Sequence, residues 1–145
     1  MRVDFYILPD HTAQGRLLLA CRLAEKAFTM EHTVYIQAQS EAQAAELDDL
    51  LWTFRQSSFI PHALAGTADA AAAPVRIGWG KTIEEQKAEV LINLDDDLPP
   101  RLDTFQRVAE VVDQDSQVLR ASRERFRQYR ERGVEPTTHR LEALR

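Results

Sequence analysis

The chain has 145 residues, which suits one domain with a single hydrophobic core. Hydrophobic residues make up 44% and charged residues 28%, as in ordinary globular proteins, and no apolar run approaches the roughly 18 residues that a membrane span needs. The net charge of −5 argues against broad nucleic-acid binding, and the single cysteine, Cys21, excludes an internal disulfide. A lone thiol fits a reducing compartment, and residues 1–10 turn acidic too soon for a secretory signal, so we expect a cytoplasmic protein.

Strands and helices alternate in the first half of the chain. Residues 2–8 (RVDFYIL) alternate in polarity and are rich in β-formers, which predicts a strand. Thr12 can cap a helix over residues 13–30, and residues 33–38 (TVYIQA) read as a second strand. Ser40 followed by Gln43 is a capping-box pattern, and the helix that it opens should run to about Trp52.

The second half is predicted to hold three strands and one helix. We expect a flexible loop over residues 66–74, a strand over 74–79, a polar loop over 80–87 and a strand over 89–94. Residues 107–112 (RVAEVV) favour a last strand, with a helical turn as the alternative. Residues 116–132 predict a helix that ends at Gly133 with Pro136 beyond, and the last residues should be frayed.

This order of elements predicts an α/β fold. Strands that alternate with helices need crossover connections, which favour a largely parallel sheet covered by helices on both faces. We therefore expect residues 1–145 to form one domain with Rossmann-like layers.

The signatures of nucleotide and enzyme chemistry are absent. The turn after the first strand, PDHTAQGR, has neither of the glycine-rich patterns that cradle phosphates, so no nucleotide-binding loop is expected. Asp95, Asp96 and Asp97 follow an apolar strand and resemble the edge of a magnesium site, which keeps a nucleotide- or metal-dependent enzyme as an alternative. The four histidines lack the spacing of a metal pair, and there is no nucleophile elbow. We expect no catalytic residues, no metal and no cofactor.

Residues 47–66 (LDDLLWTFRQSSFIPHALAG) combine large apolar residues with turn formers. Trp52, Phe54 and Phe59 lie where the predicted helix gives way to an irregular crossing. These rings either seal the edge of a core, as most aromatic residues do, or line a groove.

The helix over residues 116–132 carries two neighbouring stripes. The apolar and aromatic stripe consists of Leu119, Ser122, Phe126 and Tyr129. The basic stripe consists of Arg120, Arg123, Arg127 and Arg130. Residues 116–145 hold eight arginines and four glutamates, whereas the preceding 115 residues carry a net charge of −9. The pattern indicates either a core helix with a solvated basic flank or a site for a peptide with aromatic and carboxylate groups. A phosphate or nucleic-acid site on the arginines is the further alternative.

Several motifs together resemble the chi subunit of bacterial DNA polymerase III. They are Phe5-Tyr6, LDDLLW at residues 47–52, SFIPHALAG at 58–66, PVRIGW at 74–79, VLINL at 90–94 and RERFRQYRERG at 123–133. The resemblance extends from Val3 to about Gly133. It implies a non-catalytic subunit that has a nucleotide-binding type of fold but binds no nucleotide. The family pairs with the psi subunit in the clamp loader and binds the acidic, phenylalanine-ended tail of single-stranded DNA-binding protein.

The resemblance also implies which residues bind the tail. Trp52 and Phe59 form one wall of the expected groove, and Arg123, Phe126 and Arg127 form the other. The protein would then contact DNA only indirectly and would have no membrane partner.

Overall fold

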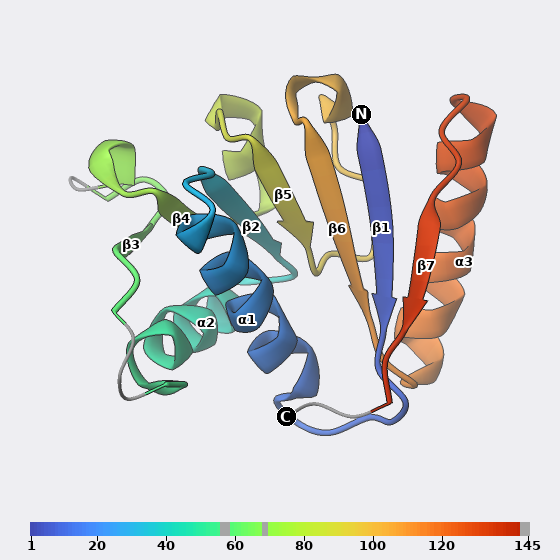
Figure 1. Ribbon diagram of the computed structural model, residues 1–145, viewed down its shortest axis with the longest axis horizontal. Coiled ribbons are helices and arrows are strands. Elements are labelled where there is room, and N and C mark those ends of the chain that lie inside the picture. Colours follow the sequence, from blue (N-terminus) through green and yellow to red (C-terminus); the bar gives the residue numbers. More distant parts are fainter. Residues whose placement is uncertain (56–58, 68–69, 143–145) are drawn as a thin grey trace.

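The computed structural model describes residues 1–55, 59–67 and 70–142. This part of the chain contains a seven-stranded sheet in the order β3-β4-β2-β5-β6-β1-β7, and all neighbouring strands run parallel (Figure 1). The strands are β1 (Arg2–Ile7), β2 (Val34–Ala38), β3 (His62–Leu64), β4 (Val75–Trp79), β5 (Val90–Asn93), β6 (Arg107–Val112) and β7 (Thr137–Arg140). The helices are α1 (Gly15–Thr29), α2 (Glu41–Thr53) and α3 (Ser116–Glu131).

The helices lie on both faces of the sheet, as the sequence predicts. Side chains of α1 and α2 contribute to one hydrophobic cluster, and side chains of α3 contribute to another. Successive residues of a strand point to opposite faces, so Ile36 of β2 belongs to the first cluster and Tyr35 to the second. The expected α/β fold with Rossmann-like layers and a parallel sheet is confirmed.

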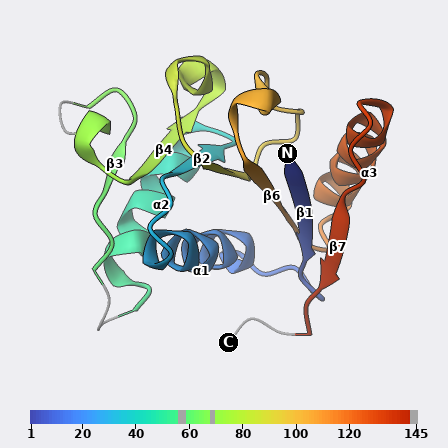
Figure 2. The same ribbon diagram turned by 45° about the horizontal axis from the view of Figure 1, so that its top comes forward.

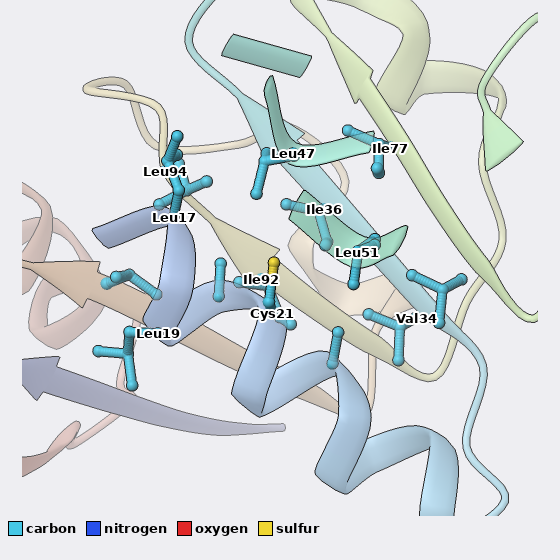
Figure 3. Close-up of a cluster of buried hydrophobic side chains, with 14 of the residues drawn as sticks. Leu17, Leu19, Cys21, Val34, Ile36, Leu47, Leu51, Ile77, Ile92 and Leu94 are labelled. Carbon is cyan, nitrogen blue, oxygen red and sulfur yellow. The ribbon is translucent and has the colours of Figure 1, made fainter. Parts of the chain in front are cut away.

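Cys21 is part of the core between α1 and the sheet. Its side chain is fully buried and lies beside Ile92 (Figure 3), and burial raises the thiol pKa to about 12. The residue therefore acts as a small apolar side chain in the structure.

The ends of two helices follow their predicted signals. Ser40 accepts a hydrogen bond from the Gln43 backbone nitrogen at 3.1 Å and caps α2. Gly133 follows α3 with a φ of 82°, a left-handed conformation that favours glycine. No helix in the described ranges is both long and apolar enough to cross a membrane.

Four stretches differ from the prediction. The C-terminal residues are not frayed at 137–140, because β7 pairs with β1 along its whole length. The crossing after α2 contains β3, and residues 80–85 form a 3₁₀ helix instead of a loop. The loop expected at 66–74 holds one 3₁₀ turn at Ala70–Ala72, and its residues 68–69 lie outside the described ranges. The side chains of an edge strand such as β7 are mostly exposed. Its sequence therefore does not alternate between apolar and polar residues, which is the pattern that predicts a strand.

Candidate functional site

Two aromatic residues, one in the last turn of α2 and one after it, form an exposed patch. Trp52 is 56% exposed and Phe59 is 63% exposed, and their ring centroids lie 5.4 Å apart. A buried His62 supports them, since its ring lies edge-on to Trp52 at 4.8 Å. The ring nitrogens of His62 lie 2.6 Å from the Ile60 carbonyl oxygen and 3.2 Å from that of Asp48. The sequence left open whether these rings seal the core or face outward, and the structure shows that both face outward as one unit, the aromatic patch. Phe54, in contrast, is half-buried against the core.

A second candidate site lies between α3, β1 and β7. This hollow, the α3 groove, encloses about 270 Å³ and is lined by Phe5, Ile7, Gln114, Leu119, Ser122, Arg123, Phe126, Thr138 and Arg140. Phe126 packs on Phe5 with ring centroids 5.3 Å apart and gives the groove an aromatic floor. Arg123 and Arg140 are exposed at its sides, and neither forms an ion pair with another described residue. The groove can therefore hold an apolar ring and a carboxylate together.

Arg127 lies outside the lining of this groove. Its guanidinium forms ion pairs with Glu124 and Glu131 on the same exposed side of α3. Arg130 is similarly paired, with Glu135 at 3.3 Å. Two members of the predicted basic stripe thus have their charges partly satisfied within the chain.

The structure does not bring the two predicted walls together. The aromatic patch lies at the C-terminal end of α2, which packs near the β3 end of the sheet, whereas Arg123 and Phe126 belong to α3 beside β7 at the other end (Figures 1 and 2). The two helices also cover opposite faces. The single groove expected from the sequence is therefore two separate surfaces, one with Trp52 and Phe59 and one with Arg123 and Phe126.

A buried polar network holds α3 against the sheet. Glu110 of β6 is fully buried, and its carboxylate accepts hydrogen bonds from Arg125 Nε at 3.0 Å, from the Tyr129 hydroxyl at 2.7 Å and from Asn93 Nδ2 at 3.0 Å. Arg125 Nη1 also donates to the Asp96 carbonyl oxygen at 2.8 Å. Burial, together with the Glu110 carboxylate, raises the pKa of Tyr129 well above its ordinary value, so its hydroxyl stays a donor. The network fixes the helix that carries Arg123 and Phe126.

The sequence indicates this buried network, although the two stripes predicted for the helix do not include it. The buried residues of α3 are Val118, Ser122, Arg125 and Tyr129. Ser122 and Tyr129 belong to the apolar stripe, but Val118 and Arg125 each lie one position before a stripe residue, so Leu119 and Phe126 are only half-buried. A glutamate within the apolar strand RVAEVV was the indication that a basic partner had to face it. Arg140 and Thr138, which complete the groove, had no comparable signal.

Polar side chains at the carboxyl ends of the strands make structural contacts within the chain. The buried guanidinium of Arg16 donates to the carbonyl oxygens of Leu94 at 2.9 Å and Val111 at 3.1 Å, at the ends of β5 and β6. Asp96 of the acidic edge accepts from Gln39 at 3.2 Å, and burial raises the pKa of Asp95. Within the described ranges, no three His, Cys, Asp or Glu side chains gather as metal ligands would.

Comparison with known proteins gives a consistent result. The sequence matches the family model of the DNA polymerase III chi subunit, HolC, over residues 1–137. It is 44% identical over 140 residues to DNA polymerase III subunit chi of Pseudomonas aeruginosa, covering 97% of this chain and 96% of the relative. The chi subunit of Haemophilus influenzae is 33% identical, covering 90% of this chain and 90% of the relative. The chi subunit of Escherichia coli is 30% identical, covering 92% of this chain and 94% of the relative.

Proposed function

This chain belongs to the DNA polymerase III chi subunit family, and from that premise we propose that it is a non-catalytic, cytoplasmic accessory subunit of the replicative polymerase. It links the clamp loader, through psi, to the C-terminal tail of single-stranded DNA-binding protein, and it contacts DNA only indirectly. The two separate surfaces support this bridging role, because two partners can bind at opposite ends of the sheet without competing.

We assign the tail to the α3 groove. The observation that carries this assignment is the combination of an aromatic floor, Phe126 on Phe5, with the Arg123 guanidinium, which has no ion pair among the described residues. A terminal phenylalanine ring can pack on this floor while its carboxylate meets a guanidinium in two parallel hydrogen bonds. Arg140 on the opposite wall offers a second cation for the acidic residues of the tail. Arg127 can join only if it gives up its ion pairs with Glu124 and Glu131.

We assign the aromatic patch to psi. Trp52 and Phe59 are the two large aromatic side chains that are exposed within the described residues, and His62 holds them in place. Exposed tryptophan and phenylalanine side chains that are fixed before binding are typical anchors of protein interfaces. Among the described residues no cation lies over either ring, so the patch suits an apolar partner surface better than an acidic tail.

The rival functions have less support. For a nucleotide or metal enzyme, the guanidinium of Arg16 is already bonded to carbonyl oxygens at the strand ends, and Asp96 is engaged with Gln39. For a direct nucleic-acid binder, Arg125 is buried in an ion pair, and Arg127 and Arg130 are paired with glutamates. A polyanion would have to compete with these carboxylates.

Calorimetry with a short acidic peptide ending in Pro-Phe tests the proposal. Arg123→Ala should weaken binding by roughly 1.5–3 kcal/mol, or about tenfold to a hundredfold, the scale of a charged hydrogen bond. Arg123→Lys should restore only part of the affinity, because an ammonium cannot form the two parallel bonds. Arg130→Ala is the matched control on the outer side of α3, and it should change little.

Two further measurements separate the surfaces. Amidation of the peptide's C-terminus should mimic Arg123→Ala, and the two changes together should be clearly less than additive. Trp52→Ala should leave peptide binding intact and abolish capture of psi. Full additivity, or loss of peptide binding in Trp52→Ala, would show that the tail is assigned to the wrong residues.

A further inference from the structure

A narrow apolar slot opens beside the C-terminal half of α1, on the sheet face opposite α3. This cavity, the α1 slot, encloses about 270 Å³ between the helix and the amino ends of β5 and β6. Its walls are the apolar side chains of Leu23, Ala27, Met30, Val90, Ile92 and Ala109. Met30 is 60% exposed, although it lines an apolar cavity. Methionine side chains adapt readily to a partner, and an exposed one at such a cavity is typical of binding surfaces.

The rim of the α1 slot is basic. Arg2, Lys26 and Arg107 all line it. The Nε atoms of Arg2 and Arg107 both lie 3.0 Å from Oδ2 of Asp4, which is fully buried. Two guanidiniums therefore share one carboxylate, and one positive charge remains uncompensated. The same carboxylate also lies 2.9 Å from the ring of His139.

Lys26 adds a second positive charge to this rim. It forms no ion pair with another described residue, and it lies in the last turn of α1. The fourth basic residue of the lining, His32, already has Glu89 as its partner at 3.2 Å. The uncompensated positive charge at the slot thus comes from Lys26 and from the pair formed by Arg2 and Arg107. It stands out because residues 1–115 together carry a net charge of −9.

We propose that the α1 slot is a second peptide-binding site, which takes an acidic segment of a partner protein through one large aliphatic side chain flanked by carboxylates. The aliphatic side chain enters the apolar slot, where its burial drives binding. The flanking carboxylates meet Lys26 and the Nη1 nitrogens of Arg2 and Arg107, because the other guanidinium nitrogens already face Asp4 or Tyr6. The complementarity between a basic rim and an acidic ligand gives the site its selectivity and orients the segment.

Single-stranded nucleic acid fits this site less well. Its binding sites combine a basic track along the backbone with aromatic side chains on which bases stack. The lining of the α1 slot contains no aromatic residue, and its uncompensated cations gather at one point. The slot is also independent of the α3 groove, because its walls belong to the core cluster on the other face of the sheet.

Methyl NMR can observe this site directly, because Met30 is one of only two methionines in the chain. Protein labelled at the methionine methyl groups is titrated with the peptide acetyl-Asp-Asp-Leu-Asp-Asp-amide. This probe has no free terminal carboxylate and no aromatic ring, so it lacks the ring and the terminal carboxylate that the α3 groove is proposed to bind together. The Met30 signal should shift saturably at millimolar peptide. The neutral analogue acetyl-Asn-Asn-Leu-Asn-Asn-amide and the analogue with serine in place of leucine should shift it much less.

Matched lysine variants test the charge of the rim. Lys26→Gln should weaken the binding of the acidic peptide by about two- to fivefold, the scale of an exposed ion pair, and Lys26→Glu should weaken it further. Lys81→Gln removes the same charge from an exposed position outside the slot and should have no effect. The proposal is overturned if Met30 does not respond to the acidic peptide, or if the neutral peptide binds equally well. It is also overturned if an oligothymidylate shifts the Met30 signal and the peptide does not.

Discussion

Replacement of Arg125 by methionine tests the network that holds α3 in place. The substitution removes the donor that lies 3.0 Å from Glu110 Oε1 and also the donor to the Asp96 carbonyl oxygen at 2.8 Å. Both side chains are almost completely buried, at 2% and 0% exposure, so water cannot replace the lost cation without opening the helix–sheet contact. Removing one partner of a buried ion pair typically costs about 3–5 kcal/mol, because a charge is left without compensation. Domains of this size have unfolding free energies of about 5–15 kcal/mol, so the loss should be large.

Urea unfolding followed by tryptophan fluorescence and circular dichroism measures this loss. Arg130→Met on the same helix is the matched control, because Arg130 is exposed and its partner Glu135 lies 3.3 Å away. The control should change the unfolding free energy by at most about 1 kcal/mol, as exposed ion pairs do. A loss in Arg125→Met as small as the loss in the control would refute the reasoning, since it would mean that Glu110 does not depend on this cation.

The double variant Arg125→Met/Glu110→Leu distinguishes loss of the charge pair from loss of packing. The second substitution removes the carboxylate that the first leaves uncompensated, so the double variant should be clearly more stable than the sum of the two single losses implies. Some loss should remain, because the hydroxyl of Tyr129 and the amide of Asn93 then lack their acceptor. Additive losses would indicate that the two residues act independently.

Three further outcomes are expected from the structure. Trp52→Ala should lower the unfolding free energy by less than about 1.5 kcal/mol in urea titrations, because its side chain is 56% exposed, whereas a buried ring would cost about 3–5 kcal/mol. His11 lies 2.6 Å from Asp113, whose hydrogen bond and charge raise the pKa of His11 above 6.5, so NMR titration should give a raised pKa that Asp113→Asn abolishes. The stability from this pair should be complete below about pH 6.5 and should be lost as the pH rises through the raised value. Cys21, whose pKa burial raises to about 12, should react with a thiol reagent at pH 8 only as fast as the protein opens.

The parts of the fold that the sequence predicted are those that bury apolar residues at a regular period. The strands with Ile36, Ile77, Ile92 and Val111 are buried on their helix-covered faces, so their runs of β-formers were sufficient to find them. β3 and β7 lie at the two edges and are short, and β7 has the sequence TTHR with no buried residue. Their position depends on backbone pairing with a neighbouring strand, which leaves no periodic trace in the side chains.

The sequence likewise predicted only part of the candidate site. The residue types were informative, because Trp52, Phe59 and Phe126 are the half-buried or exposed rings from which we build the two surfaces. The resemblance gave positions along the chain but not the face of the sheet on which each lies, and a spacing of about 70 residues does not determine a face. The resemblance places Arg127 in the groove with Arg123, yet its two glutamate neighbours decide its contacts.

The candidate surfaces do not lie where parallel α/β folds usually bind their ligands. Parallel α/β sheets usually bind small molecules outside the carboxyl ends of their strands, at a point where the strand order reverses. Here the buried guanidinium of Arg16 donates hydrogen bonds to carbonyl oxygens at the carboxyl ends of β5 and β6. The candidate surfaces lie instead along the sides of the sheet, at the end of α2 and between α3 and β7. The sheet of seven parallel strands is closely packed on both faces, so it is rigid. It therefore keeps a partner at the aromatic patch apart from a peptide in the α3 groove. Rigid separation of two binding surfaces is what a connecting subunit requires, and it needs no catalytic group at the strand ends.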